Sequence, residues 1–118
     1  MRVTVLALED VFDTGLAAVL DAFHTANELA DMAGFAASRF DVSVVGVRKT
    51  VRTSLGFGVP VVPAPRRAPD CVIVPAIGFK MPDVLQQALI RPDVRDAGPL
   101  LRRWAGQGGT KGRASGSP

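Results

Sequence analysis

The side chains that most often carry out covalent chemistry are scarce in this chain, which has one cysteine, Cys71, and one histidine, His24. A nucleophilic cysteine needs a lowered pKa and a nearby base, usually at a tight turn from a strand into a helix. Cys71 instead begins an apolar run, where a cysteine is commonly an inert core residue. We therefore predict no catalytic residue in this chain.

Metal and cofactor sites are not indicated either. A single histidine and a single cysteine on separate segments lack the clustered spacing of a metal site, so we interpret His24 as a helix surface or edge residue. Neither glycine-rich phosphate motif, G-x-x-x-x-G-K-[ST] or G-x-G-x-x-G, occurs. The sequence thus predicts no metal ion and no cofactor.

Three acidic residues, Glu9, Asp10 and Asp13, lie between the first predicted strand and the first predicted helix. In open α/β sheets, pockets form beyond the carboxyl ends of the strands, and the three acids occupy this position. Asp13 or Thr14 is also able to cap the helix by accepting a hydrogen bond from a free backbone N–H. Two interpretations stay open: a helix cap with a solvated turn, or the polar lining of a ligand pocket.

A second turn follows the apolar run Asp70–Pro75. That run has no charge after its first residue, so it predicts a strand covered on both faces in a parallel sheet. The small residues Ala76, Ile77 and Gly78 come next. We predict that this turn lines a binding pocket, with a plain turn as the alternative.

The elements that position these residues alternate between strands and helices. Helical spacing of apolar residues predicts a helix from Asp13 to about Met32, and the prolines of 60–65 indicate an edge or loop segment. The expected order is a strand at Arg2–Leu8, that helix, a strand at Phe40–Val47, a hairpin at Val51–Ser54 and Val59–Val62, a strand at Asp70–Pro75, and helices at Met81–Ile90 and, after Gly98-Pro99, Leu100–Ala105. This order predicts an α/β fold with a mostly parallel sheet.

Size and charge limit the possible partners. The 118 residues suffice for one small domain, and no apolar run approaches the roughly 20 residues that cross a bilayer. The net charge of +3 comes from the last part of the chain, so it gives no basis for nucleic-acid binding by the body. A start without a signal peptide, together with the single cysteine, favours the cytoplasm.

The end of the chain differs in composition from the rest. Thr110–Pro118 has one apolar side chain, Ala114, among glycines and serines. Such a segment cannot bury enough surface to order itself. We therefore predict a folded domain over 1–109 and a disordered tail over 110–118.

Three segments carry a resemblance to a known family. They are the strand at 3–8 with the acidic turn and the helix at 15–27, the hairpin segment Val51-Arg52-Thr53-Ser54-Leu55-Gly56, and the strand Pro69-Asp70-Cys71-Val72-Ile73-Val74-Pro75. In this order they resemble the N-terminal half of GlxA-type regulators of the AraC family, a ThiJ/PfpI-like, class I glutamine amidotransferase-like domain. The likeness covers about residues 2–107. It implies a flavodoxin-like three-layer sandwich, here an incomplete ThiJ/PfpI-like domain.

The resemblance implies roles for both turns. In the family, the loop corresponding to Ala76, Ile77 and Gly78 supplies a backbone N–H to an oxyanion or a ligand. Related enzymes use an acid of the first turn to contact the nucleophile, and the regulators often carry an aspartate where this chain has Gly15. The local acid here is Asp13, two residues earlier.

The resemblance also implies more chain than these residues contain. In the family, a further strand, a cysteine-containing nucleophile elbow and finally a helix-turn-helix DNA-binding domain follow. Here we expect no strand after Gly109, as a chain cut short or a shifted reading frame would produce. The edge of the strand Asp70–Pro75 would then be exposed, and exposed edges pair with other chains. We therefore expect a homodimer or a larger assembly.

Three hypotheses about function follow. The preferred one is a non-catalytic, ligand-sensing part of an AraC-family regulator, which binds a small-molecule effector and reaches DNA only through a C-terminal domain absent from this chain. The second is a fragment of a ThiJ/PfpI-like cysteine-dependent enzyme, such as an amidase, a hydratase or a glyoxalase-like protein. The third is a free-standing flavodoxin-like binding module.

Overall fold

The computed structural model describes residues 1–35, 37, 39–78, 92–107 and 110–113. The helix predicted at Met81–Ile90 lies outside these residues. In chain order the elements are β1 (Arg2–Leu6), α1 (Asp13–Met32), β2 (Asp41–Gly46), β3 (Val51–Arg52), β4 (Gly58–Val59), β5 (Val62–Pro63), β6 (Cys71–Val74), α3 (Pro92–Gly106) and β7 (Thr110–Arg113).

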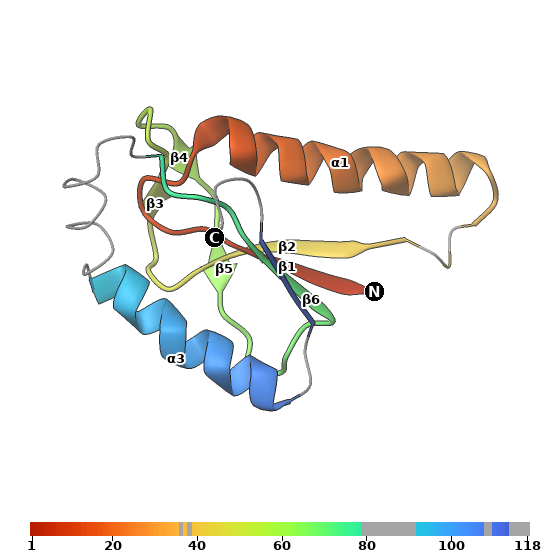
Figure 1. The fold of residues 1–118 in the computed structure, drawn as a ribbon. Helices are drawn as coiled ribbons and strands as arrows, with labels where there is room; N and C mark the ends of the chain where they lie inside the picture. Colours follow the sequence, from red (N-terminus) through yellow and green to blue (C-terminus); the bar gives the residue numbers. More distant parts are fainter. Residues whose placement is uncertain (36, 38, 79–91, 108–109, 114–118) are drawn as a thin grey trace.

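Five of the strands form one sheet in the order β5-β2-β1-β6-β7, and every neighbouring pair is parallel. β3 and β4 form a separate antiparallel hairpin. α1 lies over one face of the sheet and α3 over the other (Figure 1). The predicted α/β fold, with three layers and a mostly parallel sheet, is confirmed.

β1 is the centre of the core because its apolar side chains alternate between the two faces of the sheet. Val5 packs with Leu16 of α1, whereas Leu6 packs on the other face in a cluster with Leu100 and Trp104 of α3. Trp104 is 0% exposed. Its indole Nε1–H donates to the carbonyl of Pro65 at 3.2 Å, so the one polar group of this side chain is satisfied.

The long helix α1 has the predicted bounds, Asp13–Met32. Its predicted apolar face points toward the sheet, where Leu16 is buried and the next turns are half-buried. The acidic residues lie outside this face and are exposed: Asp21, Glu28 and Asp31. α1 therefore shields the sheet mainly through its first two turns.

The hairpin is shorter than predicted. Pairing between β3 and β4 stops at Val59, and Val62 lies instead in β5 of the main sheet, where it pairs with Val45 of β2. Pro60 explains the difference, because it has no N–H to continue an antiparallel ladder. The prediction of an edge segment around these prolines is confirmed, since β5 is the edge strand beside β2.

The prediction that a helix begins at Gly98-Pro99 is wrong. α3 begins at Pro92, a position in the first turn that proline tolerates, and it runs through Pro99. Pro99 is exposed, so water is able to hydrate the carbonyl that loses its helical partner. The opposite side of the helix holds it on the sheet, because Ala97, Leu100 and Trp104 are buried there.

The prediction of a disordered tail from residue 110 is wrong for Thr110–Arg113. These residues form β7, which pairs in parallel with β6 from Cys71↔Thr110 to Val74↔Arg113. The ladder uses backbone N–H and C=O groups, so pairing does not require apolar side chains. β6 is therefore an inner strand, and the predicted exposed edge at Asp70–Pro75 is not present in the described part. Residues 114–118 lie outside it.

Candidate functional site

Three segments distant in sequence meet beyond the carboxyl ends of β1 and β6. The backbone N–H of Gly78 donates to the carbonyl of Asp10 at 2.8 Å, and that of Phe12 donates to Ala76 at 2.8 Å. The hairpin joins them, because the N–H of Ser54 donates to the carbonyl of Val11 at 2.9 Å. The structure thus brings both predicted turns together, with all six predicted residues: Glu9, Asp10, Asp13, Ala76, Ile77 and Gly78.

Two backbone features fix the first turn. Asp10 has a φ of 65°, the left-handed region that aspartate tolerates better than most residues. This conformation reverses the chain, so that Val11 forms bridges with Thr53 of the hairpin and with Ile77 of the second turn. The resemblance implies that the loop of Ala76, Ile77 and Gly78 supplies a backbone N–H to an oxyanion or a ligand, and within this loop the N–H of Gly78 donates to the carbonyl of Asp10.

Asp13 joins α1 to the hairpin and does not cap its own helix. Its Oδ1 accepts from the hydroxyl of Ser54 at 2.9 Å and from the backbone N–H of Leu55 at 3.1 Å. Phe12 occupies the N-cap position, and no side chain caps it by a hydrogen bond. The helix-cap interpretation of Asp13 is therefore wrong.

Glu9 links the site to two other elements. Its Oε1 accepts from the backbone N–H of Arg52 at 3.0 Å. Its own N–H donates to Oδ2 of Asp93 at 3.1 Å, and Asp93 is only 8% exposed in the first turn of α3. The acidic turn therefore holds the hairpin and α3 in place at this end of the sheet.

Sequence reasoning missed the hairpin as a part of this site. Thr53 and Ser54 belong to the segment 51–56 that carries the family resemblance, and that motif was the available signal. Ser54 lies so close to the second turn that a Cβ on Gly78 would stand 2.5 Å from its Oγ. Glycine is therefore required at position 78 by packing.

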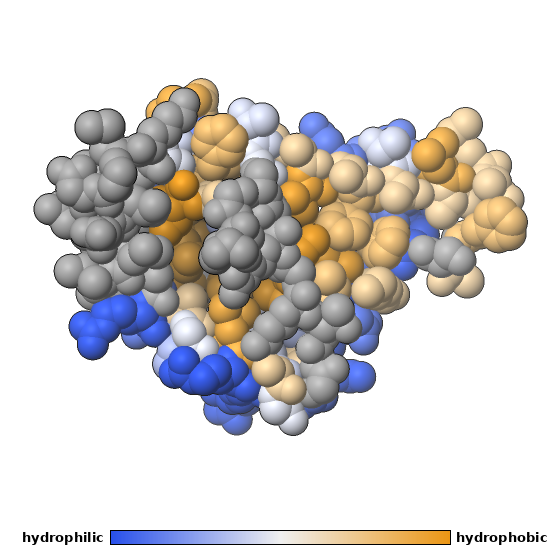
Figure 2. Space-filling view, viewed as in Figure 1, coloured by the Kyte–Doolittle hydropathy of each residue, from blue (hydrophilic) through white to orange (hydrophobic). Residues whose placement is uncertain are grey.

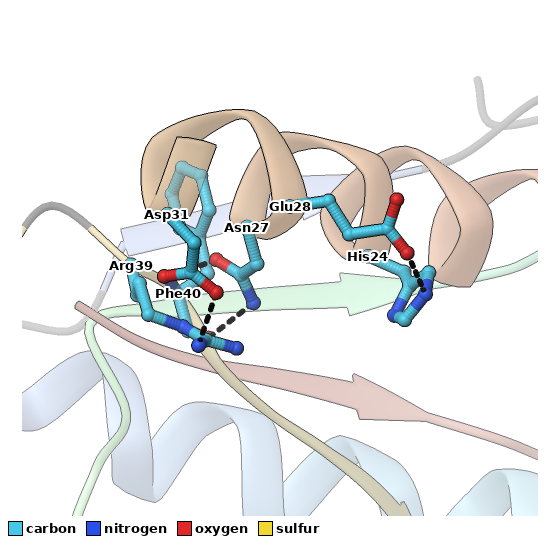
Figure 3. Close-up of polar contacts among 6 residues, drawn as sticks. All are labelled: His24, Asn27, Glu28, Asp31, Arg39 and Phe40. Carbon is cyan, nitrogen blue, oxygen red and sulfur yellow. Dashed lines mark hydrogen bonds and ion pairs between the residues drawn. The ribbon is translucent and has the colours of Figure 1, made fainter. Parts of the chain in front are cut away.

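His24 and Cys71, the two residues considered above for catalysis, lie outside this site. His24 is exposed and pairs with Glu28 at 2.7 Å on α1, as Figure 3 shows. Cys71 is a half-buried free thiol in β6. Within the described residues, no group of three or more histidine, cysteine, aspartate or glutamate side chains is arranged to hold a metal ion.

The pKa of Asp13 predicts how stability changes in acid. Desolvation would raise the pKa of this carboxyl, but hydrogen bonds from Thr53, Ser54 and the N–H of Leu55 outweigh it, so the pKa lies below its ordinary value of 3.8. Because the folded pKa is the lower one, the carboxylate stabilises the fold fully at neutral pH. This contribution is lost as the pH falls from the ordinary value through the folded pKa.

Urea unfolding between about pH 7 and about pH 3 measures this effect. Asp13→Asn should be less stable at neutral pH and should show a flatter pH dependence than the wild type. Asp21→Asn, on the exposed side of α1, is the control and should match the wild type. Identical pH dependences for wild type and Asp13→Asn would contradict the assignment.

No protein-family model matches the sequence, and no curated protein matches it. Solved structures with this fold include an AraC family transcriptional regulator from Pseudomonas putida. The two chains share 20% sequence identity and a TM-score of 0.71, and the match covers 95% of this chain and 54% of the other.

Two further structures extend the comparison. A candidate transcriptional regulator from Vibrio parahaemolyticus has 18% identity and a TM-score of 0.67, with 96% of this chain and 55% of that chain covered. A candidate protease I from Bacteroides thetaiotaomicron has 19% identity and a TM-score of 0.62, with 95% of this chain and 61% of that chain covered.

These matches define the class of fold. The chain shares the three-layer α/β fold of these three structures, as the resemblance of its three segments predicts. It spans a little over half the length of each of these three structures. Among the described helices, neither α1 nor α3 is long and apolar enough to cross a membrane.

Proposed function

We propose that this chain is the non-catalytic, effector-sensing part of an AraC-family transcriptional regulator. The observation that carries the proposal is the meeting of three loops beyond the carboxyl ends of β1 and β6, in a fold that two of the three compared structures use in regulators. Open α/β sheets bind small molecules at this edge. The protein would act in the cytoplasm.

The mechanism we propose is a shift between two arrangements of a homodimer. An effector that binds one arrangement more tightly raises its population. The hairpin and the two turns share direct hydrogen bonds, so a ligand that moves one of them acts on the others. DNA contact would require a helix-turn-helix domain outside this sequence.

The alternative is that this chain is a fragment of a cysteine-dependent enzyme. Its structural likeness to a candidate protease I favours this alternative. Such an enzyme needs a reactive thiol beside a base. The single cysteine of this chain is half-buried in β6, and the single histidine is exposed on α1, where it pairs with Glu28. We therefore prefer the sensing function.

Thermal unfolding in the presence of small carboxylic acids, amides and amines tests the proposal. A ligand at a hundredfold excess over its Kd stabilises a protein by about 2.7 kcal/mol, which raises Tm by several degrees. The shift should disappear in Asp13→Asn and persist in the control His24→Ala. Ester or amide turnover that thiol alkylation abolishes would instead support the enzyme.

A further inference from the structure

A small polar pocket lies at the end of the sheet opposite to the candidate site. Its floor includes two register pairs of the parallel strands β1 and β2, Arg2 with Asp41 and Thr4 with Ser43. Because side chains alternate along a strand, these four share the face of Leu6, on which α3 packs. The pocket measures about 180 Å³. Pockets for drug-sized ligands are larger, about 300–1,000 Å³, so only a small molecule fits here.

The wall of the pocket is the loop that runs from β5 past α3 to β6 (Figure 1). Pro63 and Pro65 of this loop line the pocket, and their rings fix the backbone angle φ. The indole of Trp104 in α3 donates to the carbonyl of Pro65 at 3.2 Å. Just after α3, Oε1 of Gln107 accepts from the N–H of Ala68 at 2.7 Å. The loop is therefore anchored before a ligand arrives, so little order is lost on binding.

Thr4, in the floor of the pocket, is buried without a hydrogen bond to its side chain. The residue is 3% exposed, and no described residue forms a hydrogen bond with its hydroxyl. A hydroxyl that is removed from water and has no partner destabilises a fold. The neighbouring side chains Val3, Val5 and Leu6 are apolar, so packing alone would favour valine at position 4. A polar molecule in the pocket supplies the missing partner.

The two charged side chains of the floor are not paired with each other. Nη1 of Arg2 donates to the carbonyl of Ala68 at 3.3 Å, which holds the guanidinium toward the loop and leaves other N–H donors available. No hydrogen bond or ion pair between described residues uses the carboxylate of Asp41. The carboxylate of Asp70 is engaged, because it accepts from the backbone N–H of Arg2 at 2.7 Å. Figure 2 shows further hydrophilic side chains over α3, at the lower edge of the view.

We propose that this pocket binds a small zwitterion, an amino acid of the size of glycine or alanine. The carboxylate of the ligand accepts from the guanidinium of Arg2, a pairing that is often bidentate. Its ammonium group has three donors, and the acceptors are the carboxylate of Asp41 and the hydroxyls of Thr4 and Ser43. A simple anion would be repelled by Asp41 and a simple cation by Arg2. The inference goes beyond effector binding at the loops and does not depend on it.

Amide chemical shifts of the full chain, titrated with glycine and with L-alanine, test the proposal. The shifts should change at residues 2–4 and 41–43 and stay constant in the loops of the candidate site, at 10–13 and 76–78. Acetate and methylamine each carry one of the two charges, and glycerol carries hydroxyls alone. These three should bind more weakly by about tenfold or more. Equal binding of glycerol, or changes confined to the loops or absent, would overturn the proposal.

Thr4→Val separates a binding role of the hydroxyl from a structural one. Valine has nearly the same shape, so the ligand-free variant should melt no lower than the wild type, because it lacks the unpartnered hydroxyl. Its affinity for glycine should fall by about tenfold. Asp41→Asn should also weaken binding, whereas Asp21→Asn, on the exposed side of α1, should leave it unchanged. A Thr4→Val variant that melts below the wild type, or binds glycine equally well, would overturn the proposal.

Discussion

Trp104→Ala should lower the free energy of unfolding by about 3–5 kcal/mol, the range for removing a large aromatic side chain from a core. The side chain is fully buried and lies in one cluster with Leu6 of the central strand and Leu100 of its own helix. Small domains are stable by about 5–15 kcal/mol in total. The expected loss is therefore a large fraction of the total stability of a domain of this size.

Urea unfolding followed by circular dichroism measures this loss, because Trp104 is the single tryptophan and its fluorescence disappears in the variant. Trp104→Phe is the matched control. It keeps much of the packing but leaves the carbonyl of Pro65 without its indole donor, so we expect a loss of about 1–3 kcal/mol. A loss under about 1 kcal/mol for Trp104→Ala would show that α3 does not pack on the sheet as described.

Gly78→Ala should cost about 1–3 kcal/mol, the range for forcing an extra group into a packed site. The new Cβ would stand 2.5 Å from Oγ and 2.6 Å from Cβ of Ser54. The second turn or the hairpin would have to move, which would separate the loops of the candidate site. Effector binding should therefore weaken together with stability.

A double-mutant cycle identifies the clash as the cause. Ser54→Gly removes both atoms that meet the new Cβ, so Gly78→Ala should cost little in that background. Ser54→Ala keeps its Cβ and should not rescue the substitution. We expect a coupling between Gly78→Ala and Ser54→Gly of about 1–3 kcal/mol in unfolding experiments. Additive effects would rule out the close contact between these two residues.

A helix or strand was predicted correctly where the local residue pattern and the packing in the fold favour the same structure. The apolar spacing of residues 13–32 predicted α1 with the observed bounds, and the run Asp70–Pro75, uncharged after its first residue, predicted a parallel strand where β6 lies. The meeting of the two turns followed from parallel pairing, because the carboxyl ends of parallel strands share one edge. Most of the candidate site therefore followed from the order of its elements.

The remaining features depend on contacts between residues distant in the sequence. Asp13 was equally suited to cap its helix, and only the return of Ser54 and Leu55 to its side decides its partners. Pro99 indicated a helix start, but burial of neighbouring side chains on the sheet outweighs that local signal. The composition of 110–113 gave no sign of β7, because its partners are backbone groups of β6.

The strand order has a consequence for synthesis on the ribosome. β1 is made first, yet its two neighbours are β2 and β6, and β6 ends only at Val74. At a translation speed of about 5–20 residues per second, the completed β1 waits about 3–14 s for its second neighbour. During that time the valine and leucine side chains of β1 are accessible to chaperones and to other nascent chains. Among the described strands, β1 therefore gains its second neighbour only after β6 has been made.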